Sequence, residues 1–153
     1  LYRFQLSLEW HFEKMEEILK DFNQAISALK EVLAVEENKI TRDSALLRFQ
    51  LCFELAWKTI KIYSRKEGVE CFSPKSCFQT AFQLNLVDYD ENWINMVEDR
   101  NMIVHIYAEE MADKIYSRLL EYLELFEKLY SKLSSKWQNK YKQINRIYPK
   151  LQW

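Results

Sequence analysis

Turn-forming residues are scarce in this 153-residue chain, which contains one glycine, Gly68, and two prolines, Pro74 and Pro149. Sheet proteins need many tight turns, and hairpin turns in particular depend on glycine. The scarcity therefore argues against a β-sandwich, a β-barrel or a glycine-rich phosphate-binding loop. Hydrophobic residues make up 48% of the chain, which argues against disorder. We expect a few long helices joined by few turns.

Metal-ligating residue types are sparse as well. The chain has two histidines, His11 and His105, and three cysteines, Cys52, Cys71 and Cys77, none of them in a CxxC pair. No zinc ligand set with standard spacing can be assembled from these residues, so we expect no metal and no cofactor. An odd cysteine count without paired spacing is typical of reduced, mostly buried thiols. We therefore expect a cytoplasmic protein with three reduced cysteines.

Long apolar runs are also missing, and no stretch of about 18 apolar residues exists that could span a membrane. Charge is distributed unevenly although the net charge is only −1. No acidic residue follows Glu127, whereas seven basic residues do, and the remainder holds 15 basic and 23 acidic side chains. This basic C-terminal end is the main compositional indication of a partner.

Apolar residues recur at alternating intervals of three and four residues in three segments, 12–33, 46–63 and 115–133. This spacing is typical of helices packed nearly parallel or antiparallel to one another. It predicts an all-α fold, an antiparallel up-and-down bundle of four to five helices. The second segment has additional apolar residues on another side, so we expect that helix to contact both the bundle and something else.

Capping residues predict where these helices begin and end. Thr41 or Asp43 is expected to cap the second helix, and Gly68 to terminate it. Ser73 and Pro74 predict a short helix through about residue 84. A further helix is expected from 88–90 through His105, and a last helix from about 109 onward. We expect a break at Ser134–Ser135, which divides a bundle at 1–133 from a basic, aromatic helical extension at 134–153.

The segment 98–107 contains the most chemically informative residues. On a helix, Arg100 falls on the apolar stripe and needs an acidic partner, because an unpaired buried charge costs several kcal/mol, a rough figure. Glu98, Asn101 and His105 share a second stripe. A histidine can move protons near neutral pH and an arginine can hold a phosphate, which together suffice for metal-free RNA cleavage. A structural histidine and a paired arginine are the alternative that the spacing leaves open.

The run Arg100-Asn101-xxx-His105-x-Tyr107 resembles the signature of the HEPN superfamily of helical-bundle proteins. The segment 48–58, RFQLCFELAWK, is similar to one branch of it, the nucleotidyltransferase substrate-binding proteins, and the resemblance covers about 8–133. It implies a dimer that pairs with a separate minimal nucleotidyltransferase. Related toxins cleave RNA with Arg and His from both protomers, and in some of them the tyrosine matching Tyr107 is modified with AMP. Ala108 departs from the polar residue that often follows this tyrosine.

We therefore expect a HEPN subunit that partners a minimal nucleotidyltransferase, either as its substrate-binding subunit or as the toxin of a toxin–antitoxin pair. The resemblance implies Arg100, His105 and Asn101 as catalytic residues, and Tyr107 and Glu98 as the modification or nucleotide-binding residues. The alternatives are a metal-independent ribonuclease active on its own and a non-catalytic helical interaction module. The expected partners are a second copy, the nucleotidyltransferase, and RNA or a nucleotide, without a membrane.

The basic end of the chain lies beyond the resemblance and interleaves seven basic residues with aromatic ones. One interpretation is that its aromatic face packs back on the bundle or on another protomer. The other is a docking arm for RNA or for the nucleotidyltransferase, because basic charge with aromatic stacking suits single-stranded RNA.

Overall fold

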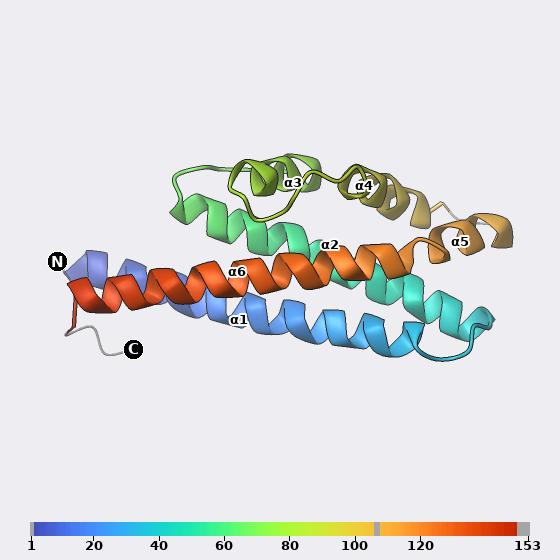
Figure 1. Ribbon diagram of the computed structural model, residues 1–153, viewed down its shortest axis with the longest axis horizontal. Helices are drawn as coiled ribbons and strands as arrows, with labels where there is room; N and C mark the ends of the chain where they lie inside the picture. The colour runs from blue at the N-terminus through green and yellow to red at the C-terminus, as the bar shows by residue number, and fades with distance from the viewer. Residues whose placement is uncertain (1, 106–107, 150–153) are drawn as a thin grey trace.

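The structure is a computed structural model that describes residues 2–105 and 108–149. The described residues form six helices and no strand, which confirms the all-α helical bundle. The helices are α1 (Tyr2–Leu33), α2 (Lys39–Lys66), α3 (Pro74–Gln83), α4 (Asn92–Ile103), α5 (Glu109–Tyr116) and α6 (Leu119–Ile147). The long helices α1, α2 and α6 lie side by side, and α3 and α4 cover α2 on the side away from α1 (Figure 1).

The core consists of the residues that the three-and-four spacing selected. Every selected residue of the second and third segments is buried, and in the first segment only Phe12 and Leu33 are partly exposed. Aromatic rings fill the centre: Phe49 stacks on Tyr122 with ring centroids 5.4 Å apart, and Phe78 lies 4.8 Å from Trp93. Burial of large side chains at these positions drives the packing of α1, α2 and α6.

The start of α2 lies earlier than predicted. Asn38 is its N-cap, and the side-chain oxygen of Asn38 accepts hydrogen bonds from the backbone N–H groups of Ile40 and Thr41. The Thr41 side-chain oxygen in turn accepts a hydrogen bond from the Asn38 backbone N–H at 2.8 Å. The predicted caps Thr41 and Asp43 were therefore wrong, because Thr41 occupies the third position of a reciprocal capping box.

Two other boundaries are confirmed. Gly68 follows α2 with φ of +78°, a left-handed conformation that glycine adopts without strain. Ser73 caps α3 by accepting from the Ser76 N–H, and Pro74 occupies the first turn. Both signals are local, which is why the sequence predicts them well.

The last predicted helix is divided at Ser117–Arg118 into α5 and α6, and the predicted break at Ser134–Ser135 was wrong. The Ser117 hydroxyl donates to the Lys114 carbonyl at 2.7 Å, a local bond that competes with helical bonding. At 134–135, by contrast, buried Leu133 and Trp137 flank the serines and anchor α6 to the core. This division accounts for six helices where four to five were predicted.

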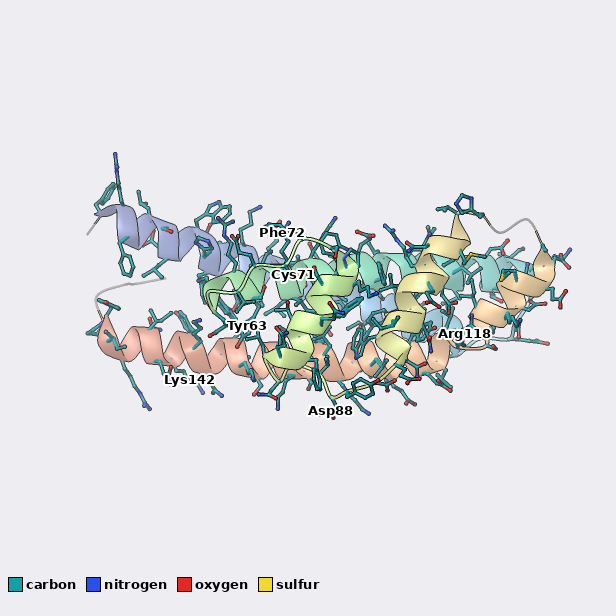
Figure 2. The ribbon with its side chains drawn as sticks, turned by 90° about the horizontal axis from the view of Figure 1, so that it is seen from above. Tyr63, Cys71, Phe72, Asp88, Arg118 and Lys142 are labelled. Carbon is teal, nitrogen blue, oxygen red and sulfur yellow. A yellow bond between two sulfur atoms is a disulfide. The ribbon has the colours of Figure 1, made fainter. Side chains whose placement is uncertain are left out.

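The cysteines also differ from expectation. Cys71 and Cys77 form a disulfide, so the prediction of three reduced thiols was wrong for this pair (Figure 2). The loop after α2 turns back beside the first turn of α3, which brings the two residues together. Cys52 is free and buried as predicted, and burial raises the pKa of its thiol to about 12.

The C-terminal turns of α6 pack along the N-terminal turns of α1. The indole N–H of buried Trp137 donates to Glu16 at 2.9 Å, and the Trp137 ring stacks on Phe12. Both helices extend past the end of α2 (Figure 1). Across the described ranges, none of the helices combines the length and apolar character needed to cross a membrane.

Candidate functional site

The predicted site residues lie at the C-terminal end of α4 and just beyond it. Glu98, Arg100 and Asn101 belong to α4, which ends at Ile103. The prediction that this helix continues through His105 was wrong. The His105 N–H instead donates to the Met102 carbonyl at 2.9 Å, a tighter three-residue bond typical of a helix end.

Three of these side chains face solvent. Glu98, Asn101 and His105 are exposed, and the helical stripe predicted to join them stops with the helix before His105. Tyr107 lies outside the described residues. His105 therefore lies exposed to solvent just beyond the end of α4.

Arg100 has the acidic partner that its position requires. Its guanidinium binds the carboxylate of Glu54 on α2 with an N–O distance of 2.5 Å and lies 5.4 Å from the centre of the Phe53 ring. It also donates to the side-chain oxygen of the neighbouring Asn101 at 3.2 Å. The side chain of Arg100 is 38% exposed and that of Glu54 29% exposed. Arg100 thus lies at the rim of the core, and the interpretation that it is buried in the apolar stripe was wrong.

Glu54 is the residue that connects the two motifs found in the sequence. Its second carboxylate oxygen accepts a hydrogen bond from the Trp57 indole N–H at 3.1 Å and lies 3.7 Å from the Lys58 ammonium. Both carboxylate oxygens of Glu54 therefore have partners. The segment 48–58 and the segment 98–107 therefore meet at one place on the surface.

Asp99 is a structurally important residue that the sequence analysis missed. Its buried carboxylate accepts two hydrogen bonds from Arg118, at 2.8 and 2.6 Å, and one from the Tyr122 hydroxyl at 2.6 Å. Burial and the hydrogen bond to Asp99 raise the pKa of Tyr122 above its ordinary value. The spacing of three residues from buried Met96 is the signal that could have identified it. This network fixes α4 against the start of α6 beside the Arg100–Glu54 pair.

A row of exposed apolar residues borders the same end of α4. Leu47 and Leu51, one turn apart on α2, are 68% and 53% exposed, and Met102 and Val104 are exposed as well. Leu47 and Ile103 line a common hollow of about 320 Å³ between α2, α5 and the end of α4. Apolar residues gathered in this way beside a charged pair are typical of a surface that another protein chain covers.

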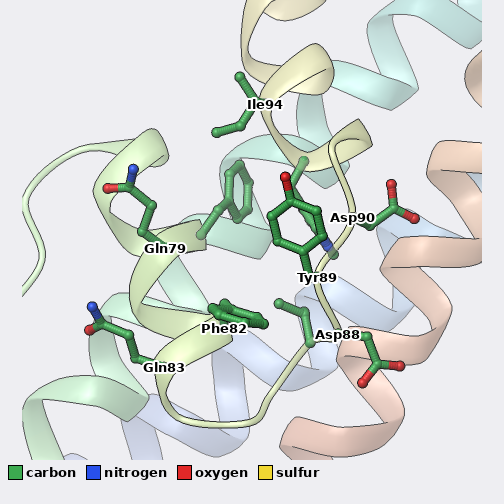
Figure 3. A pocket seen from close by; sticks show the side chains of 10 residues that line it. Gln79, Phe82, Gln83, Asp88, Tyr89, Asp90 and Ile94 are labelled. Atoms are coloured by element: carbon green, nitrogen blue, oxygen red, sulfur yellow. The ribbon is translucent and has the colours of Figure 1, made fainter.

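A larger cavity of about 560 Å³ lies elsewhere, between α3 and α4. Phe82 and Tyr89 flank it with ring centroids 6.0 Å apart, whereas Asp88 and Asp90 point from the adjoining loop toward α6 (Figure 3). None of the described site residues predicted from the sequence lines this cavity.

The replacement Arg100→Ala is expected to lower the free energy of unfolding by only about 1 kcal/mol, since both side chains of the ion pair are about one-third exposed and solvent screens them. Glu54 keeps Trp57 and Lys58 as partners in this variant. The melting temperature should fall by roughly 2–4 °C, whereas His105→Ala should leave it nearly unchanged. Thermal unfolding of both variants measures this, and a loss several times larger for Arg100→Ala would contradict the exposed position.

Comparison with known proteins relates the chain to a solved structure and to a protein family. The crystal structure of ttk003001694 from Thermus thermophilus is similar to the chain with a TM-score of 0.69 and 36% sequence identity, over 73% of this chain and 98% of that chain. No curated protein matches the chain. The model of the family described as nucleotidyltransferase substrate binding protein like matches residues 13–135, which include the Arg100–Glu54 pair. The chain therefore belongs to the nucleotidyltransferase substrate-binding protein-like family.

Proposed function

We propose that this protein is the HEPN subunit of a two-protein system whose other member is a separate minimal nucleotidyltransferase. It acts as the substrate-binding subunit of that enzyme or as a toxin that the enzyme silences by adenylylating Tyr107. The observation that carries the proposal is the contact of Arg100 with Glu54, which brings both family-like motifs together at one exposed site. Membership of a family named for substrate binding to nucleotidyltransferases supports the partner.

We further propose that the protein works as a homodimer. The exposed apolar residues Leu47 and Leu51 lie beside the end of α4 and supply a surface for a second copy. A two-fold contact there would place two copies of Arg100 and His105 along one groove. A composite site of this kind explains why His105 is exposed in the single chain.

Mass spectrometry of the protein co-purified with its nucleotidyltransferase tests the proposal. The enzyme should co-purify with the chain, and the mass of the chain should rise by whole AMP units when the chain is a silenced toxin. The variant Tyr107→Phe should lose this gain, whereas Tyr116→Phe, the matched control, should keep it. Failure of the two proteins to co-purify would contradict the partnership, and a gain that persists in Tyr107→Phe would contradict the modified residue.

A metal-independent ribonuclease is the second candidate. It is favoured because more than a third of the Arg100 side chain is exposed and His105, five residues further along the chain, is exposed as well. The unmodified protein would then cleave RNA in EDTA and leave 2′,3′-cyclic phosphate ends, with His105 moving the proton. The same preparations address this candidate, because His105→Ala should abolish cleavage. Co-purification without modification or cleavage would identify a substrate-binding subunit or an interaction module.

A further inference from the structure

We propose that the pocket at the C-terminal end of α2 binds a phosphate group. This phosphate pocket encloses about 340 Å³, and Ser7 and His11 of α1, Arg65 and Lys66 of α2, and Lys140 of α6 contribute to its lining. It lies at the place where α1 and α6 extend past α2 (Figure 1). Ser7, His11 and Lys140 fall outside the family match, so the inference goes beyond the proposed function and does not depend on it.

Lys66 is the residue of the pocket that a bound anion would stabilise most. It is half-buried, and its ammonium lies 4.8 Å from the centre of the Trp137 ring. Among the described residues, no carboxylate lies within ion-pair distance of Lys66. Burial and the neighbouring charge of Lys140 lower the pKa of Lys66 to about 8. A bound anion would offset the desolvation of the ammonium and its repulsion by Lys140.

The neighbouring cations are already partly neutralised, which leaves Lys66 as the dominant unpaired charge. Lys140 binds Glu67 at 2.8 Å and the Lys66 carbonyl at 3.5 Å, and Arg65 lies 3.8 Å from Glu70. On α1, the carboxylate of Glu16 accepts a hydrogen bond from the Trp137 indole N–H. Arg65, Lys66 and Lys140 line the pocket itself and no acidic residue does, and among these three cations Lys66 is the one without an ion pair to a described residue.

The chemistry of these groups matches a phosphate better than a carboxylate. Lysine supplies a point charge, arginine a planar pair of donors, and serine a hydroxyl, so several phosphate oxygens can be bound at once. The Nδ1 atom of His11 lies 2.6 Å from the Ser7 carbonyl, which fixes the ring at the edge of the pocket. Trp10 is exposed and its ring lies 4.9 Å from that of His11, so it offers a ring for the base of a nucleotide or of a single strand.

Isothermal titration calorimetry of the full chain at low salt tests the site, with pyrophosphate and a single-stranded oligouridine as the two probes. Lys66→Met should weaken binding at least tenfold, whereas the matched control Lys142→Met, an exposed lysine of α6, should change it less than threefold. Lys66→Met removes a desolvated charge, so the variant should fold and keep its melting temperature. Pyrophosphate binding identifies a nucleotide phosphate, and binding of the oligonucleotide alone identifies a strand.

The affinity should also fall between pH 7 and pH 9. Lys66 is mostly protonated at pH 7 and loses its charge through a pKa of about 8, so the wild type should lose affinity in this interval. Lys66→Met should lack this component of the pH dependence. The proposal is overturned if neither probe binds, if Lys66→Met and Lys142→Met lose affinity equally, or if the affinity of Lys66→Met changes between pH 7 and pH 9 by the same factor as that of the wild type.

Discussion

The replacement Asp99→Ala is expected to lower the free energy of unfolding by about 3 kcal/mol, because it removes a buried carboxylate that both Arg118 and the buried Tyr122 hydroxyl bind. Arg118 would lose both of its hydrogen bonds to Asp99, and the buried Tyr122 hydroxyl would lose its acceptor. A loss of this size corresponds to a fall in melting temperature of roughly 6–12 °C for a protein of this length.

Thermal and denaturant unfolding would measure the loss, with Glu98→Ala as the control one residue away. Glu98 is exposed, so its replacement should change the free energy of unfolding by no more than about 0.5 kcal/mol. The loss of free energy of unfolding in Asp99→Asn should lie between those of Asp99→Ala and Glu98→Ala. The amide oxygen can still accept a hydrogen bond from Tyr122, but it carries no charge to pair with Arg118. Equal stability of Asp99→Ala and Glu98→Ala would show that the network does not hold α4 in place.

The replacement Leu47→Glu is expected to convert the proposed dimer into a monomer. Leu47 is more exposed than Leu51, the leucine one turn further along α2. A two-fold contact would bring the two introduced glutamates near each other in an apolar environment. Loss of one apolar anchor at the centre of an interface costs about 2 kcal/mol or more, and the buried like charges add to this cost.

Light scattering at micromolar concentration measures the change, and Leu120→Glu provides the control. Leu120 is an exposed leucine of α6, so a charge there should leave the dimer intact. The folded state of Leu47→Glu should be unchanged, because the Leu47 side chain already contacts solvent in the single chain. A monomeric wild type would contradict the dimer, and a dimeric Leu47→Glu would place the interface elsewhere.

Patterns that act over one or two helical turns were readable in the sequence. The apolar spacing identified the core, and Ser73 and Gly68 marked helix ends, because these effects depend on neighbours along the chain. The disulfide between Cys71 and Cys77 was not readable, since it depends on how the loop after α2 turns back onto α3. The break at Arg118 depends in part on Asp99 of another helix, which spacing within one helix does not reveal.

The candidate site was predictable to a similar degree. The family-like motif selected Arg100 and His105, and the expectation that Arg100 has an acidic partner is confirmed. The partner is Glu54, which is separated from Arg100 by 46 positions in the sequence. Its identity follows only from the packing of α4 on α2. Asp99 was overlooked because the motif draws attention to its neighbour.

Adjacent residues of α4 bind in two directions, Asp99 to α6 and Arg100 to α2, and this has a consequence for the timescale of motion. The Asp99 network holds the backbone of α4, so Arg100 can leave Glu54 by rotation about its side-chain bonds alone. Glu54 retains the Trp57 indole as a donor when this happens. Such rotamer exchange takes picoseconds to nanoseconds, whereas helix displacement takes microseconds or longer. The guanidinium can therefore change partners much faster than the fold can rearrange.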